Sequence, residues 1–160
     1  MCTLIIPVHK GLFMTNENNI SQLYSELELS TPDLSTLAER CKLLTEILLD
    51  CTSHPQVQPV SRCLAAYLDV FQTELDKSMA DFRIVEFSHE QSLPQPGAWL
   101  LEDTETQCNY CRALNHVLLI SHFDRNMLPH LTGLLHDIAH AMADGLAASA
   151  QEKSINIIHC

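Results

Sequence analysis

The chain has 160 residues, of which 46% are hydrophobic and 18% charged, so it is long and apolar enough to form one domain around a buried core. Its formal net charge of −11, from 20 acidic and 9 basic residues, opposes binding to nucleic acid and to anionic membrane surfaces. No apolar run approaches the roughly 18 to 20 residues that a membrane-spanning helix needs. The composition therefore favours another protein as partner, and the acidic balance would suit a basic one.

The 7 cysteines are an odd number, and their spacing shows no framework of paired loops. Cys41, Cys51 and Cys63 stand where helical patterns call for small apolar residues, a role that a free buried cysteine can fill. Because free cysteines persist in reducing compartments, we expect a cytoplasmic protein.

The N-terminus has a short apolar run without a preceding cationic region or a convincing cleavage site, which argues against a secretory signal. A start at Met14 would leave the helical part intact. We therefore expect residues 1–15 to be an extended segment that need not belong to the core. Residues 16–160 are expected to form a single helical domain.

The first predicted helix covers residues 17–29, where apolar side chains recur at helical spacing. The second has the clearest signal: Thr31 suits the N-cap, Pro32 the first helical position, and Asp33 the positive end of the helix dipole. Its apolar seam, with steps of three and four residues, consists of Leu34, Leu37, Cys41, Leu44, Leu48 and Cys51. A seam of this length is typical of a helical bundle rather than of a standalone coiled coil.

A third helix is predicted over residues 60–80, after the prolines of SHPQVQP end the second one. Residues 83–101 differ, because FRIVEF alternates at the strand period and AWLLE could form a second extended piece. We expect a short extended insertion there, either a two-stranded β-ribbon or an irregular connector lying across the bundle.

Two further helices are predicted over residues 103–121 and 127–150, joined by a loop at FDRN, with Pro129 tolerated in the first turn of the last helix. The tail SINIIHC favours extended structure. The predicted fold is therefore all-α, a bundle of about five helices with an extended insertion near residues 83–101.

Two short stretches carry the residues best suited to metal binding: QCNYCRALNH holds Cys108 and Cys111, and LLHDIAHA holds His136, Asp137 and His140. Cys-x2-Cys followed by His-x3-His has the ligand types of a structural zinc site. Counting along an antiparallel helical hairpin puts Cys111 near the height of His140. The apolar stripe of the last predicted helix, which should face the core, consists of Leu128, Leu131, Leu135, Ile138 and Met142. The helical wheel opposes the zinc site, because Cys111 faces the predicted core while both histidines lie roughly 130 to 170° from the centre of that stripe.

LLHDIAHA also resembles the histidine–aspartate core motif of the HD-domain metal phosphohydrolases, over these residues alone. The resemblance implies that His136 and Asp137 bind a divalent metal ion that activates water. The family also takes a histidine from an earlier helix, which His116 or His122 would supply, and an aspartate from a later helix. No aspartate follows Asp144 in this sequence.

One face of the last predicted helix carries few bulky side chains and little charge, and it consists of Gly133, His136, His140 and Asp144. Glycine inside a helix costs roughly 1 kcal/mol relative to alanine, which is explained if another helix approaches closely, from this chain or from a partner. Trp99, after PQPG, could also anchor a partner. These five residues form the predicted partner-binding site.

The sequence contains no nucleophile elbow, phosphate loop or paired-carboxylate motif. We therefore predict a small acidic, non-enzymatic, protein-binding regulator of the adaptor, anti-activator or chaperone-like kind, which could also form homodimers. The alternative is a metal-binding protein with zinc or another divalent metal as cofactor. It would be an HD-like phosphohydrolase or a zinc-stabilised module that uses Cys108, Cys111, His136 and His140.

Overall fold

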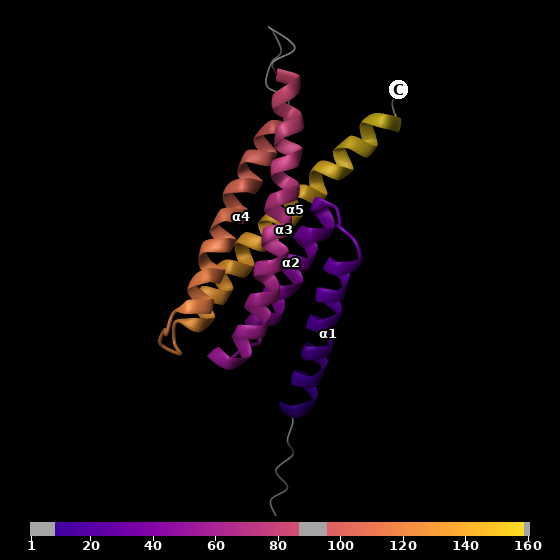
Figure 1. Cartoon of the computed structure of the whole chain (residues 1–160). Coiled ribbons are helices and arrows are strands. Elements are labelled where there is room, and N and C mark those ends of the chain that lie inside the picture. Colours follow the sequence, from indigo (N-terminus) through magenta and orange to yellow (C-terminus); the bar gives the residue numbers. More distant parts are fainter. Residues whose placement is uncertain (1–8, 87–95, 159–160) are drawn as a thin grey trace, which may run out of the picture. The chain divides into compact units, whose positions relative to one another are not determined.

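The computed structural model describes residues 9–86 and 96–158, and within these ranges it consists of α-helices and their connections. The helices are α1 (His9–Leu29), α2 (Leu34–Leu49), α3 (His54–Glu86), α4 (Pro96–Ile120) and α5 (Leu128–Ile158) (Figure 1). The prediction of an all-α fold with about five helices is confirmed. None of the described helices has the length and apolar character needed to cross a membrane.

The chain divides into two compact units, Met1–Thr31 and Pro32–Cys160. The first contains α1, whose 21 residues begin at His9. Residues 9–15 are therefore helical where an extended segment was expected, and residues 1–8 lie outside the described part of the chain. Helix α1 ends at Leu29, where the backbone N–H of Ser30 donates to the carbonyl of Glu26.

The second unit is a bundle in which α2 contacts α3 and α5, and α4 contacts α3 and α5, so that the four helices form a closed ring. They run alternately up and down (Figure 1). The α2–α3 connection spans residues 50–53 and the α4–α5 connection residues 121–127, both short enough to make antiparallel neighbours. These two connections lie at the same end of the bundle.

The start of α2 is fixed by Asp33 rather than by Thr31, the N-cap expected from the sequence. A carboxylate oxygen of Asp33 accepts from the backbone N–H of Thr36 at 2.7 Å. Hydrogen bonds from Thr36 lower the pKa of Asp33. Aspartate is an equally good N-cap, and the helix therefore begins two residues after Pro32.

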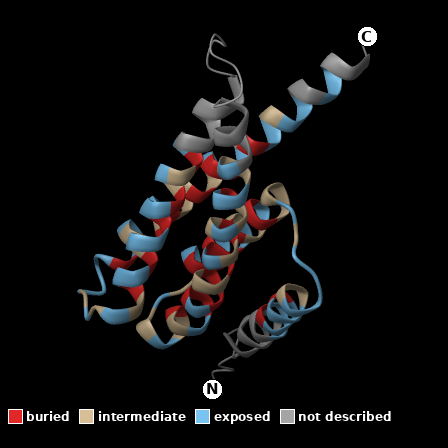
Figure 2. Cartoon of the chain, turned by 45° about the horizontal axis from the view of Figure 1, so that its top comes forward, coloured by how far each residue is buried: buried red, intermediate tan, exposed pale blue. Residues whose placement is uncertain are grey.

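The core of the bundle is built from the inward side of each of its four helices (Figure 2). Its largest fully buried side chains are Leu37, Leu44, Leu48, Val57, Leu64, Tyr67, Leu68, Phe71, Leu75, Leu118, Leu135 and Met142. Burying one such side chain contributes roughly 1.5 to 3 kcal/mol. The seam predicted for the second helix is buried at Leu37, Cys41, Leu44 and Leu48. Its two end residues, Leu34 and Cys51, are only partly buried, and Cys51 lies beyond the end of α2.

The predicted β-ribbon insertion near residues 83–101 is wrong wherever the structure describes it. Residues 83–86 are the last of α3 and residues 96–101 are among the first of α4, while residues 87–95 lie outside the described ranges. Extending an existing helix adds one backbone hydrogen bond for each residue that is ordered, which outweighs the modest strand preference of FRIVEF and AWLLE. The tail SINII is helical for the same reason, as part of α5.

Helix α3 also begins earlier than expected, at His54, and runs through Pro59. Pro55 stands in the first turn, where its missing N–H has no helical acceptor to lose. Pro59 removes one backbone hydrogen bond, but that loss is borne by a helix of 33 residues with a long buried side. The prolines therefore mark the start of α3 and not a long break.

Candidate functional site

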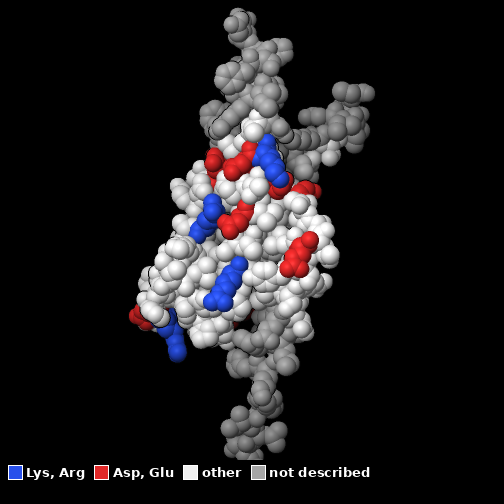
Figure 3. Space-filling model, viewed as in Figure 1, with Lys and Arg blue, Asp and Glu red and all other residues white. Residues whose placement is uncertain are grey.

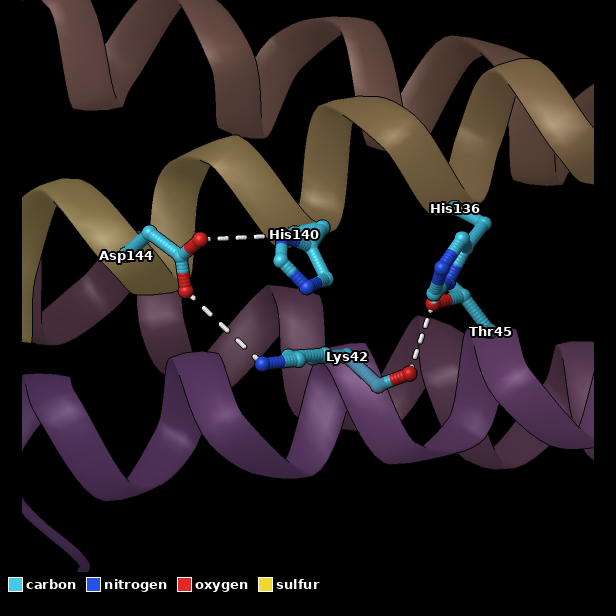
Figure 4. A network of polar contacts seen from close by, with 5 residues as sticks. All are labelled: Lys42, Thr45, His136, His140 and Asp144. Carbon is cyan, nitrogen blue, oxygen red and sulfur yellow. Dashed lines mark hydrogen bonds and ion pairs between the residues drawn. The ribbon is translucent and has the colours of Figure 1, made fainter.

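Helix α5 has two flanks of different character because it packs between α2 and α4. The flank toward α2 carries a polar network of Lys42, Thr45, His136, His140 and Asp144 (Figure 4). The flank toward α4 is apolar. The flank toward α2 contains most of the residues that the sequence predicts to bind a partner. The flank toward α4 contains residues that the sequence predicts to lie in the core.

His136 makes the hydrogen bond that joins α5 to α2. The hydroxyl of Thr45, which is fully buried, donates to the carbonyl of Lys42 at 2.6 Å. Because that proton is already used, the contact of 3.1 Å between Thr45 Oγ1 and His136 Nδ1 requires the imidazole to be the donor. His136 therefore carries a proton on Nδ1, and it lies against α2 instead of facing a partner.

Asp144 connects the outer end of the same network. Its carboxylate lies 3.0 Å from His140 Nδ1 and 3.7 Å from Lys42 Nζ (Figure 4). The imidazole rings of His140 and His136 meet edge to face, with centroids 5.6 Å apart. The side chains of His140 and Asp144 keep 44% and 57% of their exposure, so they alone in this network stay available to a partner.

Gly133 and Trp99 complete the predicted partner-binding site. A Cβ atom added at Gly133 would meet nothing within 4 Å, so no close helix approach requires glycine there. Trp99 belongs to α4, and its side chain lies outside the described part of the structure. The structure therefore brings together His136, His140 and Asp144, and binding of a partner by His140 and Asp144 stays a prediction.

Cys108 and Cys111 both lie in the core, fully buried on the inward side of α4. Burial raises the pKa of Cys108 to about 11 and that of Cys111 to about 12. Cys41 and Cys63 are equally buried; burial raises the pKa of Cys63 to about 12, and burial and then neighbouring thiols raise that of Cys41 well above its usual value. All four are therefore neutral thiols at neutral pH, and neutral thiols are poor nucleophiles.

Neither proposed metal site is supported by this geometry. Within residues whose side chains the structure describes, no three His, Cys, Asp or Glu side chains are placed to hold a metal ion. Cys108 and Cys111 face the core, whereas His136 is directed at Thr45 of α2. Asp137 is exposed on the opposite side of α5 from the core, so it does not share a ligand position with its neighbour His136.

The stability of the network can be tested at Thr45. Thr45→Val removes the acceptor of the His136 Nδ1–H, which leaves a partly buried donor without a partner, and should lower the free energy of unfolding by about 1 to 3 kcal/mol. Thr45→Ser keeps the hydroxyl and should lose much less. Urea unfolding of the two variants measures the difference, and equal losses would show that the hydrogen bond contributes nothing.

The second flank forms an exposed apolar surface, which we call the α4–α5 apolar face. It consists of Tyr110, Leu114 and Val117 of α4 and Leu131, Leu134 and Ile138 of α5. Tyr110 is 57% exposed, Leu134 50% and Val117 37%, and the other three are half-buried. The six therefore form a surface that water reaches.

The contacts of each helix show that these residues lie on the facing flanks of α4 and α5. On α4, Asn115 donates to the carbonyl of Ser61 and Arg112 pairs with Asp69, so that flank of α4 faces α3. At 100° per residue, Tyr110, Leu114 and Val117 lie on the opposite flank, toward α5. On α5 the flank with His136 faces α2, which leaves the flank with Leu131, Leu134 and Ile138 toward α4.

None of the six side chains of the α4–α5 apolar face is charged. Counting outward from the loop places Val117 level with Leu131, and Tyr110 level with Ile138, across the antiparallel pair. The charged side chains of this stretch point elsewhere: Arg112 to α3 and Asp137 to solvent. An uncharged apolar strip on two adjacent helices suits contact with an apolar surface of another molecule.

The sequence contains a signal for this face, because apolar residues recur at steps of four and three residues, at Met127, Leu131, Leu134, Ile138 and Ala141. This signal is ambiguous because a buried seam has the same spacing. Comparison with known proteins gives no independent assignment: the chain matches no protein-family model, no curated protein and no solved structure.

Proposed function

We propose that this protein is a non-enzymatic regulator that binds another protein through the α4–α5 apolar face. The observation that carries the proposal is the exposure of Tyr110 and Leu134, two large apolar side chains on neighbouring helices, beside the half-buried Leu114, Leu131 and Ile138. An apolar surface on two neighbouring helices is a common receptor for the apolar side of an amphipathic helix.

The acidic surface is a weaker basis for recognition. On the face shown in Figure 3, acidic and basic side chains alternate rather than gather in a patch of one sign. Three of the described cations are also paired with carboxylates, as in Lys42–Asp144, Lys77–Glu74 and Arg112–Asp69. The net charge affects solubility and the rate of association with a charged partner, whereas the apolar face would supply the affinity.

The test is a charge placed on the α4–α5 apolar face, compared with the same charge elsewhere. Leu134→Glu changes a side chain of this face that is 50% exposed, and Leu49→Glu changes one that is 45% exposed at the end of α2. Both should leave the fold intact, which circular dichroism and urea unfolding verify. A partner retained by the native chain and by Leu49→Glu should bind Leu134→Glu at least about 30-fold more weakly, the loss expected at a contact worth 2 kcal/mol.

Two outcomes would contradict the proposal. If purified partners bind Leu134→Glu and Leu49→Glu equally well, the α4–α5 apolar face is not the interface. If sedimentation shows that the native chain forms dimers and that Leu134→Glu is a monomer, this face is occupied by a second copy and not by a separate protein. Both measurements use the full chain, so α1 and the residues outside the described ranges are present.

A further inference from the structure

A cavity of about 270 Å³ lies at the end of the bundle where the α2–α3 and α4–α5 connections meet. Ser53, His54, His122 and Arg125 all line it. These side chains are hydrogen-bond donors or cations, and no aspartate or glutamate lines the cavity. The lining thus carries one permanent positive charge, on Arg125, in a chain with more than twice as many acidic as basic residues.

The hydrogen bonds around His54 fix which of its ring nitrogens carries the proton. Gln58 Nε2 donates to the carbonyl of Leu119 at 2.9 Å, which settles the orientation of the amide. The same nitrogen lies 3.0 Å from His54 Nε2, so this ring nitrogen accepts. His54 therefore carries its proton on Nδ1 and keeps one N–H donor that has no partner among the described residues.

The neighbours of His54 hold its ring in place. His122 lies beside it with ring centroids 5.9 Å apart, and Phe123 contacts it edge-on at 6.1 Å. His122 forms no hydrogen bond with a described residue, so its ring N–H is also unused. Two imidazoles thus stand together at the wall of one cavity, each with a donor available.

Arg125 adds a full positive charge that no described carboxylate neutralises. The nearest acidic residue in sequence, Asp124, accepts from the backbone N–H of Asn126 at 3.2 Å and so closes the loop locally. The hydroxyl of Ser53 likewise has no hydrogen-bond partner among the described residues, whereas that of Thr52 is used by Gln56 Oε1. The cavity therefore offers a guanidinium, a hydroxyl and two ring N–H groups with no acceptor.

We propose that this cavity binds a small oxyanion, the phosphate or carboxylate group of a ligand. Such groups supply several acceptor oxygens and a negative charge, and arginine is the side chain best matched to them. The guanidinium excludes a metal cation from the same position. Helix α3 begins at His54, so the positive end of its dipole adds to the field in the cavity. The site is separate from the α4–α5 apolar face, and its occupancy does not depend on the function proposed above.

The direct test is to titrate the full chain with inorganic phosphate and, separately, with acetate, at constant ionic strength. Binding is monitored by calorimetry and by the NMR signals of the histidine rings. Saturable binding of either anion is expected, and the tighter of the two identifies the chemical group. Arg125→Gln should weaken it at least about 10-fold, since it removes the only full charge in the lining. Arg62→Gln, at an exposed cation of α3 away from the cavity, should leave it unchanged.

A second readout keeps the test independent of the ring signals. An anion that binds only the folded chain raises the temperature of unfolding as its concentration passes the dissociation constant. This rise should be present for the native chain and for Arg62→Gln, and lost for Arg125→Gln. Equal weakening by both substitutions would show general charge attraction and overturn the proposal, as would the absence of saturable binding of either anion.

Discussion

Raising the pH from 8 to 10 is expected to lower the free energy of unfolding on the order of 4 kcal/mol, through the four buried thiols of Cys41, Cys63, Cys108 and Cys111. In the unfolded chain these thiols ionise near their usual pKa of 9. In the folded chain burial raises the pKa of Cys63 and Cys111 to about 12 and that of Cys108 to about 11. Between these values the folded state retains protons that the unfolded state has lost.

The sign follows from that difference. Stability is full below pH 9, and it falls as the pH rises from 9 toward 12, by up to about 1.4 kcal/mol per thiol for each pH unit. Urea unfolding at pH 8, 9 and 10 under reducing conditions measures the slope. Cys111→Ala should reduce the change between pH 8 and 10 by about 1 kcal/mol, and an unchanged slope in this variant would show that Cys111 is not buried.

The largest effect of a single substitution is expected at Phe71, which is fully buried in α3. Phe71→Ala removes a whole ring from the core and leaves a cavity, which typically costs about 3 to 5 kcal/mol. Because the total stability of a domain is about 5 to 15 kcal/mol, the temperature of unfolding should fall by roughly 10 °C or more.

Two comparisons show whether the loss comes from packing. Phe71→Leu keeps most of the apolar volume and should lose clearly less than Phe71→Ala. Leu49→Ala, at a side chain that is 45% exposed, should change stability by less than about 1 kcal/mol. Thermal unfolding of the three variants gives the order, and similar losses at Phe71 and Leu49 would contradict the position of Phe71 in the core.

Helical periodicity predicts most of the fold, and the predictions fail where two residues suit the same role or where one segment suits two structures. Thr31 and Asp33 are both good N-caps, and only the backbone decides which is used. The strand-favouring residues in FRIVEF predict an extended segment only where a sheet is present for them to pack against. The bundle offers none within the described residues, and the helix continues to Glu86.

The orientation of α5 was the error with the greatest consequence for the site. The sequence suggested a core stripe that includes Leu131 and Ile138, whereas Thr132 and Ala139 are the residues buried at those levels. Small side chains let the neighbouring helices come close, and this packing preference cannot be read from hydrophobicity alone. The buried side of α5 is thereby rotated relative to the predicted apolar stripe by roughly 50°, which is half of the 100° between successive residues.

That rotation accounts for both flanks of α5. It moves His136 from the predicted solvent side to the α2 interface, where it reaches Thr45. It also moves Leu131 and Ile138 outward, next to Leu134, and so creates the α4–α5 apolar face. The polar residues could thus be picked out by type and spacing, but their surroundings depended on packing between helices that the sequence did not specify.

The closed ring of helices also determines how the chain can fold. The α2–α3 and α4–α5 pairs join neighbouring segments, but the Thr45–His136 hydrogen bond joins residues 91 positions apart. Forming such a distant contact requires closing a long loop, whose entropy is lost before any packing energy is gained. We therefore expect closure of the α2–α5 interface, rather than the formation of any single helix, to limit the rate of folding.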